Sequence, residues 1–137
     1  PGYRLFVAGN VGAHLHRSMD EITCLGEIDD LADAYRLADL TVSPVNVGTG
    51  LKIKIIESMA YGIPVIGTSY SLTGVPEIFR ECCLAVGNRQ EFRNALASLL
   101  EDPARLRRMH RSCRNAVEEY QRINEHNLRR VFFADEP

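Results

Sequence analysis

The chain has 137 residues, 45% of them hydrophobic and 25% charged, which is long enough for one domain with a sizeable core. Its formal net charge of −2 argues against a nucleic-acid-binding protein, because such a protein carries a basic surface. No apolar run approaches the roughly 20 residues of a membrane-spanning helix, and no signal-peptide pattern is present.

The four cysteines do not have the spacing of a zinc site or of a disulfide framework. None has a Cys-x-x-Cys partner, and neighbouring Cys82 and Cys83 are poorly placed to bond to each other. This pattern predicts reduced thiols, a cytoplasmic protein and no metal site.

The first part of the chain alternates short apolar runs with loops that contain glycine. We expect a buried strand over Tyr3–Ala8, further strands over Ile22–Leu25 and Leu40–Ser43, and a helix over Leu31–Ala38 whose N-cap is Asp30. The alternation predicts an α/β fold, a doubly wound Rossmann-like parallel sheet. Since the first strand begins almost at the first residue, we expect the chain to be part of a longer protein.

The stretch Val47–Thr68 contains the strongest functional pattern. A glycine-rich entry, Gly48-Thr49-Gly50, leads into a helix with Lys52 in its first turn. The first N–H groups of a helix lack partners, and together with the positive end of the helix dipole they form an anion site. A lysine at this position adds to the positive field, which favours an anionic ligand.

The same helix has an apolar stripe and a defined end. Helical spacing predicts that Ile53, Ile56, Met59 and Ala60 pack on one face, with Glu57 at the border of that face, where an acid usually has a partner. A left-handed Gly62 and then Pro64 end the helix before a buried parallel strand over Pro64–Thr68.

The remainder of the chain is mainly helical. We expect a short helix from Pro76 to about Arg80, a strand over Leu84–Val86 and at least three further helices, the first capped by Asn88. Five arginines share one face of the helix after Pro103: Arg105, Arg107, Arg108, Arg111 and Arg114. We favour a solvated helix face over the alternative, docking on a partner or on anionic lipid at the inner face of the membrane.

In a doubly wound sheet, ligands bind at the carboxyl ends of the strands. The loops at Gly9, Gly26 and Gly48 each follow a predicted strand, so we expect all three at one edge of the sheet. This predicts a ligand site without reference to any motif.

Residues Glu57 to Thr68, ESMAYGIPVIGT, resemble the donor-binding helix of GT-B-fold retaining glycosyltransferases of the large group 1 type. The resemblance implies one Rossmann-like half of a GT-B enzyme, the C-terminal donor-binding domain, lacking its own first strand and the N-terminal acceptor domain. It also implies a nucleotide-diphosphate sugar as donor, hexosyl transfer with retention of configuration, and no requirement for a divalent metal. The isolated chain is expected to be inactive, because the N-terminal domain forms the other wall of the cleft.

The resemblance also assigns roles to particular residues. Glu57 matches the second acid of the family, which binds the donor ribose, and Thr49 occupies the position of the first acid. Backbone groups of Glu27 and Ile28 match those that hold the base. The implied nucleotide-sugar-binding residues are Gly9, Glu27, Ile28, Gly48, Thr49, Gly50, Leu51, Lys52, Ile53 and Glu57.

Other α/β functions remain open. A nicotinamide-dependent oxidoreductase would use Glu27 or Asp29 as its ribose acid, but only Gly9 and Gly12 of the Gly-x-Gly-x-x-Gly fingerprint are present. A receiver-like signalling domain needs a pair of acids after its first strand, and the sequence there is Ala8-Gly9-Asn10. Epimerases and phosphorylases with the GT-B fold also remain, since a fold does not fix a reaction.

Overall fold

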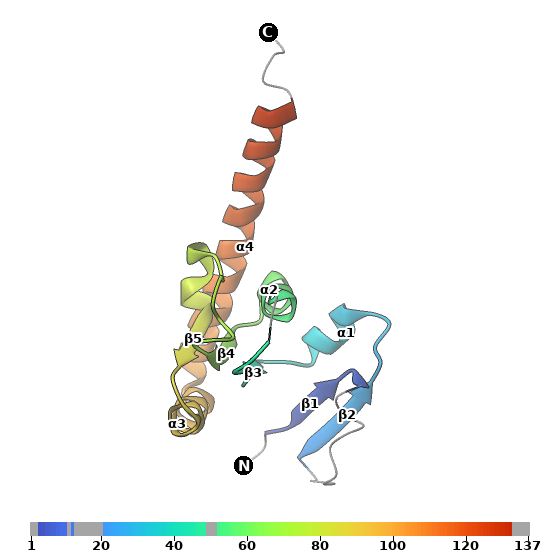
Figure 1. Cartoon of the computed structure of the whole chain (residues 1–137), viewed down its shortest axis with the longest axis vertical. Helices are drawn as coiled ribbons and strands as arrows, with labels where there is room; N and C mark the ends of the chain where they lie inside the picture. The colour runs from blue at the N-terminus through green and yellow to red at the C-terminus, as the bar shows by residue number, and fades with distance from the viewer. Residues whose placement is uncertain (1–2, 11, 13–20, 49–51, 133–137) are drawn as a thin grey trace. The chain divides into compact units, whose positions relative to one another are not determined.

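A computed structural model describes residues 3–10, 12, 21–48 and 52–132 of the chain. The chain divides into two compact units, Pro1–Ala38 and Asp39–Pro137, whose elements are labelled in Figure 1. All strand pairs in the described part of the chain are parallel, as predicted, and they form one sheet in each unit.

The described residues of the first unit form a two-stranded sheet and one helix: β1 (Leu5–Ala8), β2 (Ile22–Gly26) and α1 (Leu31–Arg36). The predicted cap of α1 is confirmed, because the Asp30 carboxylate accepts a 2.8 Å hydrogen bond from the N–H of Ala32. None of the three elements has a buried residue. The prediction of a buried first strand is therefore wrong, since the described part of this unit, two strands and a six-residue helix, offers too little surface to cover it.

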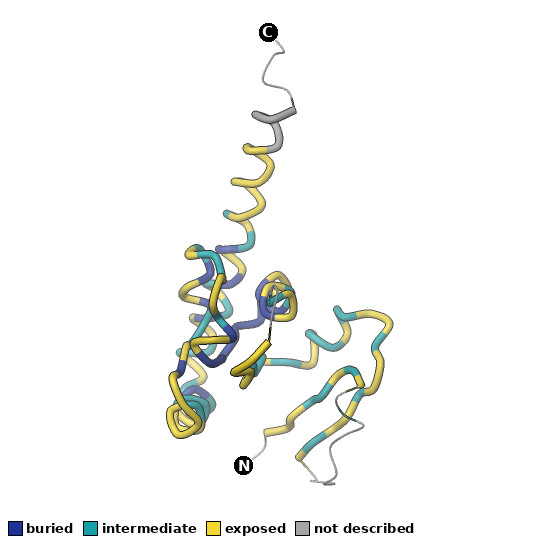
Figure 2. The backbone as a smooth tube through the Cα atoms, viewed as in Figure 1, coloured by how far each residue is buried: buried dark blue, intermediate teal, exposed yellow. Residues whose placement is uncertain are grey.

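The second unit contains a three-stranded parallel sheet in the order β3-β4-β5, with helices around it. Its elements are β3 (Thr41–Ser43), α2 (Ile53–Ala60), β4 (Val65–Thr68), the 3₁₀ helix η2 (Glu77–Cys82), β5 (Cys83–Val86), α3 (Arg89–Leu100) and α4 (Pro103–Phe132). All four residues of the central strand β4 are buried, as expected of a strand with neighbours on both sides. In Figure 2, buried residues are concentrated in β4 and in the adjoining part of α4.

The hydrophobic core joins α2, β4, η2 and α4. Its buried members are Ile55, Met59, Val65, Phe79, Cys82, Cys113 and Ala116. All four cysteines of the chain are free thiols. Burial raises the pKa of the Cys83 thiol to about 12, and a hydrogen bond to Cys82 raises the pKa of Cys113, so both stay protonated at neutral pH.

In the described residues, two helices follow the last strand, so the prediction of at least three is wrong. Helix α4 continues for 30 residues from Pro103 to Phe132, which leaves no room for a third helix in the described residues. It begins at a proline and contains no glycine or further proline, so nothing in its sequence interrupts it.

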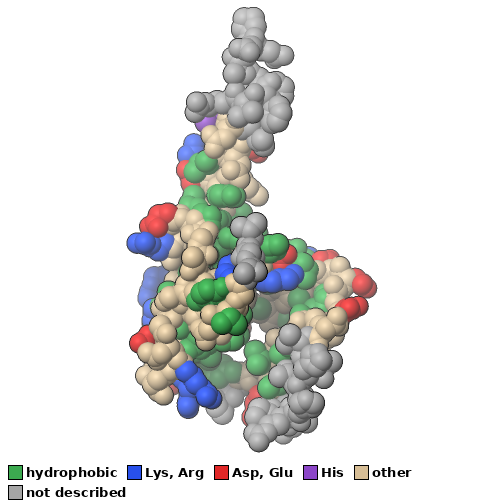
Figure 3. All heavy atoms as spheres, in the orientation of Figure 1, with side chains coloured by type: hydrophobic (Ala, Val, Ile, Leu, Met, Phe, Trp, Pro, Cys, Tyr) green, Lys and Arg blue, Asp and Glu red, His purple; other side chains and the backbone are tan. Residues whose placement is uncertain are grey.

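The predicted exposure of the arginine face of α4 is confirmed for four of its five arginines. Arg107, Arg108, Arg111 and Arg114 are exposed, and Arg105 is half-buried. On the face shown in Figure 3, basic side chains at the edge of the second unit are interspersed with acidic ones, as on an ordinary solvated surface. None of the helices in the described ranges combines the length and apolar character needed to cross a membrane.

Helix α2 ends in the predicted glycine turn. Gly62 has a φ of +77°, its N–H donates to the carbonyl of Met59, and the N–H of Ile63 donates to the carbonyl of Ser58. These two bonds define a Schellman motif. The buried Ser58 hydroxyl lies 2.7 Å from that of Thr41 and 3.0 Å from the Ile63 carbonyl, which ties the helix to the start of β3.

His110 of α4 fixes the same turn from the other side. Its Nδ1 lies 2.9 Å from the Gly62 carbonyl oxygen, and its Nε2 lies 2.8 Å from the Asp39 carbonyl oxygen. Because carbonyl oxygens only accept, each contact is a hydrogen bond where the ring nitrogen concerned carries a proton, so the donor depends on the tautomer. The ring thus connects α4 to the end of α2 and to the residue that leads into β3.

We predict that His110→Ala lowers the free energy of unfolding by about 1–3 kcal/mol, because a hydrogen bond from the imidazole to a backbone carbonyl is lost. Urea denaturation monitored by circular dichroism measures the change. The control is Arg111→Ala at the next, exposed position, which should stay within about 0.5 kcal/mol of wild type. Equal stabilities of the two variants would show that His110 does not anchor the turn.

Candidate functional site

The first feature of the site is the start of α2, where Lys52 is the N-cap. Its backbone (φ −83°, ψ 56°) is not helical, but its carbonyl accepts from the N–H groups of Ile55 and Ile56 at 2.9 and 3.2 Å. The predicted position of Lys52 is therefore corrected by one place, from the first turn to the cap. Three of the predicted site residues, Thr49, Gly50 and Leu51, lie outside the described residues.

The side chain of Lys52 rests against an aromatic ring that the sequence analysis missed. The Lys52 Nζ lies over the ring of Tyr70, 4.4 Å from its centroid, in a cation–π arrangement. The Tyr70 hydroxyl also donates a hydrogen bond to the carbonyl of Gly48. Tyr70 follows the carboxyl end of β4, so the available signal was an aromatic residue placed at the edge where ligands bind in parallel sheets.

The loop that carries Tyr70 is held against β3 and β4. The buried Ser71 hydroxyl lies 2.9 Å from the Thr68 carbonyl and 3.1 Å from the Ser43 carbonyl. The Thr68 hydroxyl accepts from the Ser71 N–H at 3.0 Å and donates to the carbonyl of Val45. These bonds pair polar groups that would otherwise be buried without partners.

Gly67 makes this close packing feasible. A Cβ added at Gly67 would meet the Ser71 Oγ at 2.5 Å, the Leu72 Cγ at 3.2 Å and the Ser43 carbonyl oxygen at 3.3 Å. A residue with a side chain would therefore push the loop away from the sheet.

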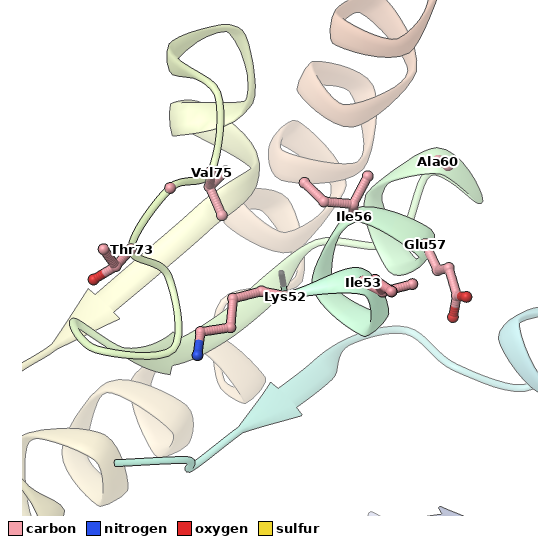
Figure 4. Close-up of a pocket in the computed structure, with 8 residues that line it drawn as sticks. Lys52, Ile53, Ile56, Glu57, Ala60, Thr73 and Val75 are labelled. Carbon is pink, nitrogen blue, oxygen red and sulfur yellow. The ribbon is translucent and has the colours of Figure 1, made fainter. Parts of the chain in front are cut away.

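A groove of about 380 Å³ lies between α2 and the segment 73–75. Figure 4 shows residues that line it: Lys52, Ile53, Ile56, Glu57, Ala60, Thr73 and Val75. Ile53 is 58% exposed, Ile56 is 37% exposed and Ala60 is also exposed, so they do not form the predicted packed face with Met59. The buried face of α2 is instead formed by Ile55, Ser58 and Met59, because those positions point toward the core.

Glu57 has the cation partner expected for an acid at the border of the helix. Its carboxylate lies 3.0 Å from the Nζ of Lys54, and its side chain is 26% exposed. In Figure 4 the side chains of Lys52 and Glu57 extend away from each other. The groove thus has a cation at the start of α2 and a carboxylate further along the same helix.

The first unit brings two of its predicted loops together. The N–H of Gly9 donates to the carbonyl of Gly26 at 2.6 Å, and the Asn10 amide donates to the Glu27 carboxylate at 3.3 Å. Both loops follow the carboxyl ends of paired parallel strands. Ile28, half-buried, follows in the turn before α1. The expected meeting of these loops with the Gly48 loop stays a prediction.

Metal ligands do not gather in the described part of the chain. No group of three or more His, Cys, Asp and Glu side chains there is arranged to hold an ion. The charged groups of the groove are the side chains of Lys52 and Glu57.

Comparison with known proteins places the chain in a family. The family model described as glycosyl transferases group 1 matches residues 2–102. Among solved structures, the chain is similar to sucrose-phosphate synthase from Thermosynechococcus elongatus, with 31% sequence identity and a TM-score of 0.61. That similarity covers 85% of this chain and 31% of the other, so the chain spans about a third of that protein. No curated protein matches.

We predict that Gly67→Ala destabilises the chain by about 1–3 kcal/mol, the usual cost of overpacking a filled site. The cost should fall in a Ser71→Ala background, because the contact at 2.5 Å is then removed. A double-mutant cycle by urea denaturation measures this coupling. The same cost in both backgrounds would contradict the close approach of Gly67 and Ser71.

Proposed function

The chain belongs to the group 1 glycosyltransferases, and on that basis we propose that it binds the nucleoside diphosphate of a sugar donor at the start of α2. The complete enzyme would transfer the sugar to an acceptor with retention of configuration. The observation that carries the proposal is the position of Lys52, whose ammonium is held at the N-terminal end of an eight-residue helix.

The physical reason is charge development on the leaving group. When the glycosidic bond to the donor breaks, negative charge builds up on the diphosphate. A helix N-terminus and a fixed ammonium stabilise that charge most where it appears. Lys52 and the adjoining backbone of Ile53 would carry this function, and the predicted contributions of Gly48, Thr49, Gly50 and Leu51 belong to the same proposal.

Glu57 is proposed to bind the ribose hydroxyls. It lies five residues beyond Lys52, which is about 7–8 Å along the axis at 1.5 Å per residue. A donor that lies along the helix would have its diphosphate at Lys52 and its ribose toward Glu57. The Lys54–Glu57 pair is exposed on the lysine side and only weakly stabilising, so the carboxylate can accept ligand hydroxyls at little cost.

The remaining predicted contacts are made to the base of the donor and near its other parts. We propose that the backbone of Glu27 and Ile28 holds the base and that the Gly9 loop lies near the donor. The Asn10–Glu27 hydrogen bond supports this part of the proposal, because it links the two loops concerned. The acceptor would be recognised mainly by the N-terminal domain of the same enzyme.

We predict that Lys52→Ala weakens binding of a nucleoside diphosphate by about 1–3 kcal/mol, the value of a charge-assisted hydrogen bond, and leaves the bare nucleoside unaffected. Glu57→Gln should weaken both ligands alike, because both carry the ribose. Isothermal titration calorimetry with UDP, GDP and ADP and their nucleosides measures both effects.

The matched control is Arg107→Ala, which removes one positive charge from the exposed face of α4 and should leave affinity unchanged. Urea denaturation of each variant gives the folded fraction by which affinities are corrected. If Glu57→Gln lowers stability and binding per folded molecule stays the same, Glu57 is a structural acid and its assignment to the ribose fails.

A further inference from the structure

Tyr70 contacts both parts of the proposed phosphate site, and its role is not explained by packing alone. We propose that Tyr70 is a positioning residue: its ring holds the Lys52 ammonium at the start of α2, and its hydroxyl holds the entry to the glycine loop through Gly48. The proposal rests on the proposed function, because it concerns the same diphosphate.

The ring limits the motion of a long side chain. A lysine side chain has four rotatable bonds, and ordering it costs rotamer entropy. The Lys52 Nζ lies 4.4 Å from the Tyr70 ring centroid, well within the roughly 6 Å of a cation–π contact. Part of the rotamer entropy of Lys52 is therefore lost before a ligand binds, and its ammonium is kept near the helix N-terminus.

The Tyr70 hydroxyl contacts the other part of the proposed site, the loop that begins at Gly48. It donates to the carbonyl of Gly48, a residue whose φ of +139° only glycine adopts readily. One side chain thus fixes the cation and the last described residue of the loop before α2. Phenylalanine at this position would keep the first contact and lose the second.

Tyr70 can serve as a support because both of its neighbours are anchored. The N–H of Ser69 donates to the Val86 carbonyl of β5 at 2.9 Å. The hydroxyl of Ser71 lies 3.1 Å from the Ser43 carbonyl of β3. The loop is therefore bonded to the strands on either side of β4, and the backbone that carries Tyr70 is held between them. A rigid support of this kind is what a binding side chain needs.

The test compares Tyr70→Phe and Tyr70→Leu with wild type. A ring at 4.4 Å shields nearby protons, so the Lys52 side-chain ¹H–¹³C signals should be shifted upfield in wild type and in Tyr70→Phe. Tyr70→Leu should return them to ordinary lysine positions. This readout needs no ligand and is not moved by a change in stability alone.

Binding is measured with inorganic pyrophosphate and with the nucleoside diphosphate that binds wild type most tightly. Tyr70→Leu should weaken both about two- to fivefold, as expected for an exposed cation–π contact, and Tyr70→Phe should weaken them less. In a Lys52→Ala background, the contact between the ring and the ammonium is already absent. Tyr70→Leu should then reduce the affinity for both ligands no more than Tyr70→Phe does.

The outcomes separate the two proposals. If wild type binds the diphosphate and Tyr70→Leu binds it equally well, the positioning role is overturned and the donor site stands. An ordinary Lys52 spectrum in wild type would overturn it as well. If wild type binds neither pyrophosphate nor any nucleoside diphosphate, the proposed function fails, and the positioning role fails with it.

Discussion

The close approach of β4 to the loop that follows it is the constraint on which the site depends. Gly67 leaves room for the Ser71 hydroxyl between two strands, with its Oγ 3.1 Å from the Ser43 carbonyl. That packing fixes the loop, and the fixed loop carries Tyr70 to Lys52. The absence of a side chain at Gly67 therefore helps to determine where the Lys52 ammonium lies at the start of α2. The chemistry proposed for the site needs this rigidity, because preorganised charge stabilises a leaving group without reorganising during the reaction.

The C-terminal end of α2 is also held in place by contacts with neighbouring elements. The Gly62 turn closes the helix, and His110 bonds to that turn from α4, 48 residues further along the chain. Between the two ends, Ile55 and Met59 bury one face in the core. The helix is thus anchored at its far end, along its inner face and through its N-cap, and its outer face is left open as the wall of the groove. Because its ends and inner face are anchored and its outer face is open, this short helix can serve as a binding element.

Local signals in the sequence predicted local structure well. The caps at Asp30 and Asn88, the end of α2 at Gly62 and the buried strand β4 all depend on neighbouring residues, and all are confirmed. The buried face of α2 was misassigned because isoleucine occupies three of its first four positions, so apolar spacing fits more than one face. The contact of Lys52 with Tyr70 joins residues far apart in the chain, and local spacing cannot reveal such a pair. The glycine-rich entry to α2 predicted an anion site, and the family resemblance assigned that site to a nucleotide-sugar donor, an assignment that stays a prediction.

The central claim is that a diphosphate binds at the start of α2, and an NMR titration of the ¹⁵N-labelled chain with inorganic pyrophosphate tests it most directly. We expect the largest saturable shifts at the amides of Gly48, Lys52 and Ile53, with Glu57 responding when a nucleoside diphosphate replaces pyrophosphate. Shifts that are largest on the arginine face of α4, near Arg107 and Arg111, and that vanish at about 0.15 M salt would indicate non-specific anion binding. That result, with the start of α2 unchanged, would contradict the account.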